Sequence, residues 1–211
     1  LCYFGEGAAS EGDFHAGLNM AAVQEAPVIF FCRNNGYAIS TPSDEQFKGN
    51  GIASRGVGYG IKTIRVDGND ILAVIKATQI ARAYALKENA PVLIEAMSYR
   101  LGAHSTSDDP SGYRTREEQE KWQAKDPILR MKNWMLAQSW WDEAQEIALF
   151  ESLREEVLAA VKTSEKIDKP HIDTLITDVY DEPTAQLEAQ LAQVKAHVKK
   201  HPQAYPFTAE K

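Results

Sequence analysis

The stretch Gly5-Glu6-Gly7-Ala8-Ala9-Ser10-Glu11-Gly12-Asp13 decides the fold, together with Phe30-Phe31-Cys32-Arg33-Asn34-Asn35-Gly36-Tyr37. Each stretch continues from a short apolar run that is typical of a buried strand, residues 1–4 and residues 28–31. A strand, a turn, a helix and a second strand make one βαβ unit. Because the carboxyl ends of parallel strands meet at one edge of a sheet, both polar clusters are expected to face the same site.

The side chains of these two clusters predict a magnesium and phosphate site. Glu6 supplies a carboxylate and Asn35 an amide oxygen, which with a backbone carbonyl make the hard oxygen site that magnesium prefers. Arg33 is placed to grip the same phosphate, Gly7 allows close approach of the backbone, and Ser10 is expected to cap the following helix. For either cluster alone, the alternative that it merely makes a turn stays open.

A third polar stretch, residues 99–116, follows the predicted strand 91–97 and is expected to emerge at the same edge. It contains His104 between glycines and prolines that break regular structure. An imidazole can move protons or donate a hydrogen bond to a phosphate near neutral pH. A histidine on a loop is more often a solvated surface residue, and its place at a strand end favours the functional interpretation.

These motifs resemble a known family. Gly-Asp-Gly followed at a distance by Asn-Asn is the thiamine diphosphate motif, and this sequence carries it with Glu6 in the aspartate position. More closely, the chain resembles the α subunits of branched-chain 2-oxo acid dehydrogenases. The further matching segments are Arg65-Val66-Asp67-Gly68-Asn69-Asp70, Ile94-Glu95-Ala96-Met97-Ser98-Tyr99-Arg100, Ala103-His104-Ser105-Thr106-Ser107-Asp108-Asp109, Trp140-Trp141-Asp142-Glu143 and Asp178-Val179-Tyr180.

The resemblance implies a role for each matching site residue. The implied magnesium ligands are Glu6, Asn35 and the carbonyl of Tyr37. The residues implied to contact thiamine diphosphate are Gly7, Ala8, Arg33 and His104, and His104 is also the implied catalytic residue. In the resembled family the loop with this histidine is mobile and orders around the cofactor. A serine at the position of Ser105 is phosphorylated in mitochondrial members, but their second serine site is Thr115 here, so kinase control is not predicted.

The resemblance also implies the reaction and the partners. The implied reaction is the oxidative decarboxylation of branched-chain 2-oxo acids, with transfer of the acyl group to a lipoyl arm on an acyltransferase core. The implied assembly is an α2β2 heterotetramer within a multienzyme complex, with the cofactor between α and β chains. Members of the family carry a long segment before the position of Leu1, so we expect an upstream part to be missing and the isolated chain to be inactive.

Two alternatives stay open. The α subunit of pyruvate dehydrogenase shares the Tyr-Arg-Thr-Arg-Glu-Glu run at residues 113–118, although the segments around Glu6, Tyr37 and His104 are closer to the branched-chain form. The second alternative is a non-catalytic assembly module that no longer binds cofactor. A sheet that lacks its upstream part exposes a bare edge, so we expect an oligomer rather than a monomer.

Composition excludes several classes of protein. The 211-residue chain has 44% hydrophobic residues and a net charge of −7, without a basic stripe, which argues against a nucleic-acid binder. Its apolar runs are too short to span a membrane. Its two cysteines show no metal or disulfide spacing, so a reducing compartment is expected. We favour the cytoplasm of a bacterium; the mitochondrial matrix is the alternative for a eukaryotic protein.

The predicted fold is α/β. A doubly wound, mostly parallel sheet of the thiamine diphosphate-binding type, in partial form, is predicted for residues 1–115, with further strands at 61–66 and 91–97 and a helix from Asn69 or Asp70 to about Glu88. A helical region is predicted for residues 116–211, packing on the sheet domain and on partner subunits. Its helices are expected at about 116–125, 127–137, 142–165 and 183–200.

Overall fold

A computed structural model describes residues 1–205, which fall into two compact units, Leu1–Asp142 and a second unit that begins at Glu143. The helices α5 (Arg116–Gln123) and α6 (Pro127–Ala137) belong to the first unit, which also holds the sheet. The predicted division at residues 115 and 116 stays a prediction. Among the described residues, no helix is both long enough and apolar enough to cross a membrane.

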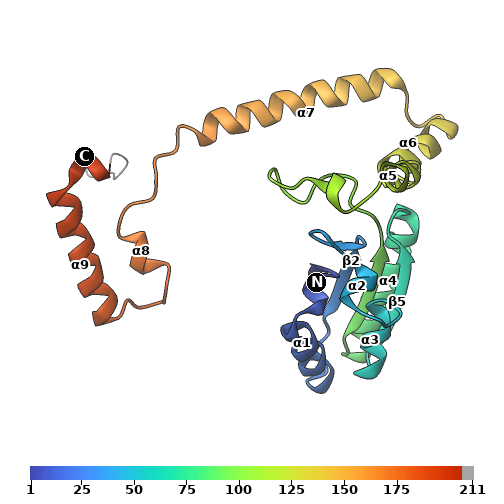
Figure 1. The fold of residues 1–211 in the computed structure, drawn as a ribbon, viewed down its shortest axis with the longest axis horizontal. Helices are drawn as coiled ribbons and strands as arrows, with labels where there is room; N and C mark the ends of the chain where they lie inside the picture. Colours follow the sequence, from blue (N-terminus) through green and yellow to red (C-terminus); the bar gives the residue numbers. More distant parts are fainter. Residues whose placement is uncertain (206–211) are drawn as a thin grey trace. The chain divides into compact units, whose positions relative to one another are not determined.

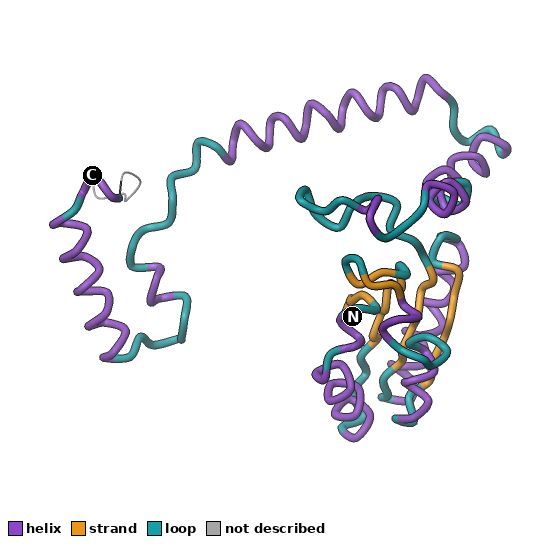
Figure 2. The backbone as a smooth tube through the Cα atoms, viewed as in Figure 1, coloured by secondary structure: helices purple, strands orange, loops and turns teal. Residues whose placement is uncertain are grey.

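A parallel four-stranded sheet forms the centre of the first unit (Figures 1 and 2). Its strands are β1 (Cys2–Gly5), β2 (Ile29–Asn34), β5 (Lys62–Asp67) and β6 (Val92–Met97), in the spatial order β1-β2-β6-β5. The apolar runs of the sequence thus became the strands, and the α/β prediction is confirmed. A separate two-stranded hairpin, β3 (Tyr37–Ala38) with β4 (Thr41–Pro42), follows β2.

Helices cover both faces of the sheet, which confirms the doubly wound prediction. On one face, Leu93 of β6 packs with Leu18 of α1 (Gly12–Val23) and with Ile52, just before α3 (Ala53–Gly58). On the other face, the neighbouring strand residues Val92 and Ile94 pack against α4 (Ile71–Glu88). Successive side chains of a strand point to opposite faces, so one apolar strand supplies both cores.

The order of the strands explains the two faces. The chain passes from β1 to β2 and then to β5 at the far edge, and it returns through α4 to place β6 between β2 and β5. Crossovers between parallel strands are almost always right-handed. Because the return step runs in the opposite direction, α4 must cover the face opposite to α1 and α3.

One local prediction is wrong. Ser10 does not cap α1, because it lies inside the 3-10 turn Ala8–Ser10, where its amide donates to the carbonyl of Gly7 at 3.0 Å. Helix α1 begins at Gly12, and Glu11 at its N-cap position makes no side-chain capping bond. The Ser10 hydroxyl instead lies 3.3 Å from Oε1 of Gln46, in the short helix α2 (Ser43–Gln46). A tertiary contact has replaced the local cap.

The second unit is helical, as the sequence predicts. It consists of α7 (Glu143–Ser164), α8 (Thr174–Thr177), α9 (Ala185–Lys200) and the 3-10 turn Pro202–Ala204. Lys195 of α9 pairs with Asp173, the residue before α8, at 2.5 Å. Along α7, large apolar side chains stay exposed, among them Phe150 at 64% and Val157 at 61%.

The start of α4 allows a direct stability test. Oδ1 of Asp70 accepts hydrogen bonds from the amides of Leu72 and Ala73, both at 3.1 Å. Replacing Asp70 by alanine is expected to lower the free energy of unfolding by about 1 kcal/mol, because the first turn loses its cap. Asp70→Asn is the matched control, since asparagine caps equally well. Urea unfolding of both variants checks this, and equal losses would show that the ion pair with Arg130, not the cap, matters.

Candidate functional site

Glu6 lies directly after β1 and is fully buried. Its Oε2 accepts a hydrogen bond from the backbone amide of Asn35 at 3.0 Å. Its Oε1 is buried and has no hydrogen-bond partner among the residues that the structure describes. A carboxylate oxygen left unpaired inside a protein is costly, so this oxygen is well suited to a cation.

The turn after β2 brings Asn35 to Glu6, as predicted from the parallel sheet. Oδ1 of Asn34 accepts from the amide of Gly36 at 3.2 Å, and Oδ1 of Asn35 accepts from the amide of Tyr37 at 3.2 Å. Gly36 has φ +88°, a conformation that favours glycine. Two successive side-chain-to-backbone bonds therefore fix this turn.

Gly7 and Ala8 lie where the chain leaves β1 and enters the 3-10 turn. A Cβ on Gly7 would lie 2.8 Å from the Cβ of Ala38 in the hairpin, so only glycine fits between the two segments. Gly7 is half-buried and Ala8 is exposed, next to the buried Glu6. This arrangement suits a phosphate approaching the backbone.

The carbonyl of Tyr37 is already engaged. Nη1 of Arg100 donates to it at 3.3 Å, and Nη2 donates to the carbonyl of Ile39 at 2.5 Å. A carbonyl oxygen has two lone pairs, so the Tyr37 carbonyl could still ligate a metal. Arg100 would then lie next to the metal. Because two positive charges repel, its guanidinium would be more stable in contact with a bound phosphate.

Arg33 is exposed at the end of β2, where it pairs in register with Gly5 of β1. Within the described residues its guanidinium has neither a hydrogen bond nor an ion pair. It is therefore available to an anion at the carboxyl edge of the sheet, and its contact with a phosphate stays a prediction.

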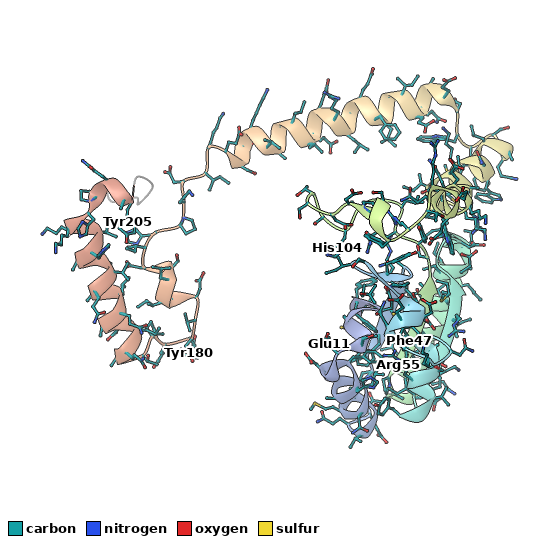
Figure 3. All side chains as sticks on the ribbon, viewed as in Figure 1. Glu11, Phe47, Arg55, His104, Tyr180 and Tyr205 are labelled. Atoms are coloured by element: carbon teal, nitrogen blue, oxygen red, sulfur yellow. The ribbon has the colours of Figure 1, made fainter. Side chains whose placement is uncertain are left out.

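His104 lies on the loop between β6 and α5 (Figure 3). Its backbone amide donates to Oδ2 of Asp108 at 2.7 Å, and the hydroxyl of Tyr113 donates to the same oxygen at 2.7 Å. The buried guanidinium of Arg114 donates to the carbonyls of Leu101 and Gly102, at 3.0 and 2.8 Å. The loop is thus held by its own side chains, and the structure forms no hydrogen bond between the exposed His104 imidazole and the other predicted site residues.

A cavity of about 440 Å³ lies beside the asparagine turn. Asn34, Tyr37, Glu118 and Trp122 are among the residues that line it. None of the residues that the sequence predicts as phosphate contacts lines this cavity. The cavity is therefore not lined by the residues of the predicted phosphate site.

Comparison with known proteins identifies the family. Residues 1–173 match the family described as the dehydrogenase E1 component. The chain belongs to this family. It is similar to the mitochondrial α subunits of 2-oxoisovalerate dehydrogenase from Macaca fascicularis (55% identity) and Dictyostelium discoideum (55%) and to α subunit 2 from Arabidopsis thaliana (48%). Each match covers 98% of this chain and 47%, 47% and 44% of the relative, so the chain spans about half their length.

This membership corrects one prediction and supports another. The relatives named above are mitochondrial proteins of eukaryotes, so the expectation of a bacterial cytoplasmic protein is contradicted. The dehydrogenase E1 component family is thiamine diphosphate-dependent, which agrees with the predicted cofactor. The recognition of a branched-chain α subunit type from the motifs is likewise confirmed by these relatives.

Glu95, to which the sequence motifs assign no role, is completely buried in β6 of this E1 component chain. Burial alone would raise the pKa of this carboxyl, but bonds from two backbone amides, Asn34 and Arg65 outweigh it and hold the pKa below its ordinary range. A signal was available, because Glu95 is the one charged residue in the otherwise apolar strand β6. A charged residue in a strand that is covered on both faces of the sheet indicates a structural or functional partner for that charge.

The phenol of Tyr37 gives the site a titratable group. Its hydroxyl donates to Oε1 of Glu118 at 2.9 Å, and burial together with this carboxylate raises the pKa of Tyr37 to about 12. A raised phenol pKa contributes stability that is complete below the ordinary value of 10 and is lost as the pH rises to about 12.

We therefore expect the free energy of unfolding of the wild type to fall more steeply between pH 10 and about 12 than that of Tyr37→Phe, which has no group to ionise. Urea unfolding at both ends of this pH range measures the difference. Parallel declines in the two proteins would contradict the assigned pairing with Glu118.

Proposed function

We propose that this chain forms the part of a branched-chain 2-oxo acid dehydrogenase α subunit that holds the magnesium and diphosphate end of thiamine diphosphate. The observation that carries this proposal is the buried, unpartnered Oε1 of Glu6 beside the Asn35 turn. The similarity to 2-oxoisovalerate dehydrogenase α subunits supports it.

Each predicted site residue has a definite task in this proposal. Glu6, the Asn35 amide oxygen and the Tyr37 carbonyl would hold magnesium, for which two neutral oxygens and one carboxylate are a suitable donor set. Gly7 and Ala8 would offer backbone amides to the diphosphate. Arg33, which has no partner within the described chain, would neutralise diphosphate charge.

His104 would donate a hydrogen bond to the diphosphate and hold a proton near the reacting carbon. Thiamine diphosphate, when bound, supplies a carbon nucleophile and an electron sink for the decarboxylation of a 2-oxo acid. The protein contributes orientation, charge balance and proton positions. Since the His104 loop is held by Asp108 and Arg114, we propose that these bonds rearrange when the loop closes over the cofactor.

The proposed partners are a β subunit in an α2β2 assembly and a lipoyl-bearing acyltransferase. No described residue here is matched to the acid that activates the aminopyrimidine, so that acid would come from the β subunit. The exposed apolar side chains of α7, such as Phe150 and Val157, support a surface that another chain covers. The isolated chain is accordingly proposed to be inactive.

A substrate panel tests this proposal. The protein is assembled with its proposed β partner and acyltransferase, and decarboxylation of 3-methyl-2-oxobutanoate is compared with that of pyruvate. We expect kcat/KM to favour the branched substrate by at least about tenfold, the scale that differences of a few methyl groups in a pocket can produce. A preference for pyruvate would contradict the substrate assignment, and inactivity toward both in the complete assembly would favour a non-catalytic module.

A further inference from the structure

Glu95 lies behind the proposed metal turn and accepts every hydrogen bond that it makes. Its Oε1 accepts from Nδ2 of Asn34 at 2.8 Å and from the amide of Ile52 at 2.9 Å. Its Oε2 accepts from the amide of Ala53 at 2.8 Å and from Nε of Arg65 at 2.9 Å. The carboxylate is fully buried, so these four donors and the Arg65 charge are what make its burial tolerable.

The bond to Asn34 determines the orientation of the Asn34 amide. Because Nδ2 is held by the carboxylate, Oδ1 must point the other way, toward the amide of Gly36 at 3.2 Å. That bond closes the turn with Gly36 at φ +88°. The same turn presents the backbone amide of Asn35 to Oε2 of Glu6 at 3.0 Å.

We infer that Glu95 is a positioning residue for the magnesium site, which it controls through the amide of Asn34 without touching the metal or the cofactor. This inference rests on the proposed function. Glu95 sets the orientation of the Asn34 amide, and Asn34 in turn fixes the conformation of the turn. The turn aligns Asn35 with Glu6. The alternative is that Glu95 only anchors the segment around Ile52 and Ala53, with no consequence for metal binding.

An exchange of hydrogen-bond polarity separates the two interpretations. Glu95→Gln replaces one accepting oxygen with an NH2 group, although all the neighbouring groups are hydrogen-bond donors. Asn34→Asp places a second carboxylate against Glu95. In the double variant, Nε2 of the new glutamine can donate to the new aspartate, which still accepts from the amide of Gly36. The link between β6 and the turn is then restored, whereas the bond to the amide of Ile52 is not.

The measurement is the magnesium concentration for half-maximal binding of thiamine diphosphate to the assembled protein, determined by calorimetric titration, together with kcat at saturating magnesium and thiamine diphosphate. Each single variant is expected to raise the half-saturating magnesium concentration by about 10–100-fold, the usual effect of losing an outer-shell partner, with kcat largely retained. In the double variant, the half-saturating magnesium concentration is expected to return to within about threefold of the wild-type value. Such a recovery would show that the two positions are strongly coupled.

Asp67→Asn is the matched control. Asp67 ends the neighbouring strand β5 and pairs with Arg130, away from the turn, so its loss should leave the magnesium requirement unchanged. Calorimetric unfolding of each apo variant identifies any that fail to fold.

Three outcomes overturn the inference. A Glu95→Gln enzyme with the wild-type magnesium requirement does so directly. A double variant no better than the worse single variant shows that Glu95 acts through the Ile52 segment alone. A wild-type assembly that is active without any divalent metal contradicts the proposed function itself, and the inference falls with it.

Discussion

Glu6→Gln is expected to abolish magnesium-dependent binding of thiamine diphosphate while making the unliganded protein more stable. The variant keeps the shape of the side chain and the acceptor for the Asn35 amide. It removes the negative charge that the proposed metal needs. We expect the affinity to fall by more than about 100-fold, beyond the loss typical of an outer-shell partner.

The gain in stability follows from the same oxygen. Oε1 of Glu6 is buried without a partner, and a buried charge without a partner costs more than a neutral amide in the same place. We expect the unfolding temperature of the unliganded protein to rise by about 2–4 °C, which corresponds to about 1 kcal/mol. Residues that serve binding often lower the stability of the unliganded protein in this way.

Glu11→Gln is the matched control, because Glu11 is an exposed carboxylate on the same segment and makes no capping bond (Figure 3). Scanning calorimetry with and without magnesium and thiamine diphosphate measures both effects. Glu11→Gln should behave as wild type. Ligand-induced stabilisation of Glu6→Gln equal to that of wild type would contradict the assigned metal ligand.

Gly51→Ala is expected to cause the largest loss of stability in the first unit. Gly51 has φ +70°, and a Cβ there would collide with Nη2 of Arg65 and would lie 2.6 Å from Oε1 of Glu95. The new methyl group must displace the half-exposed Arg65 guanidinium from the buried Glu95 carboxylate, and the residue must adopt a strained backbone conformation. Together these effects should lower the free energy of unfolding by about 2–4 kcal/mol, the sum of the backbone strain and the disturbed hydrogen bonds of a buried carboxylate whose arginine partner is partly screened by solvent.

Gly49→Ala is the control two residues away, because a Cβ on Gly49 would meet nothing within 4 Å. Urea unfolding monitored by tryptophan fluorescence measures both variants. Gly49→Ala is expected to change the free energy of unfolding by less than about 0.5 kcal/mol, as for an ordinary surface substitution. Equal stability of the two variants would show that the loop beside Glu95 is not packed as described.

The sheet and the meeting of Glu6 with Asn35 were predictable because both depend on a general rule. Apolar runs identify parallel strands, and parallel strands bring their carboxyl ends together. The side-chain contacts between distant segments follow no such rule and could not be predicted. Ser10 was predicted to cap α1 from its local sequence, but its hydroxyl meets Gln46, which is 36 residues away.

The remaining site residues show the same limit. The sequence shows Glu95 as a charged residue in an apolar strand. Its contacts with Ile52 and Ala53 could not be predicted, because these residues lie in a loop more than 40 residues earlier. The position of His104 on a loop after β6 was predicted. The bonds that hold this loop, through Asp108 and Arg114, could not be derived from spacing.

The most direct test of the account is a calorimetric titration of thiamine diphosphate into the wild-type protein assembled with its proposed β partner, in magnesium and in EDTA. We expect saturable binding in magnesium and its loss in EDTA, because the diphosphate reaches Glu6 only through a cation. Binding of equal strength in both buffers would contradict a metal site at Glu6, Asn35 and Tyr37.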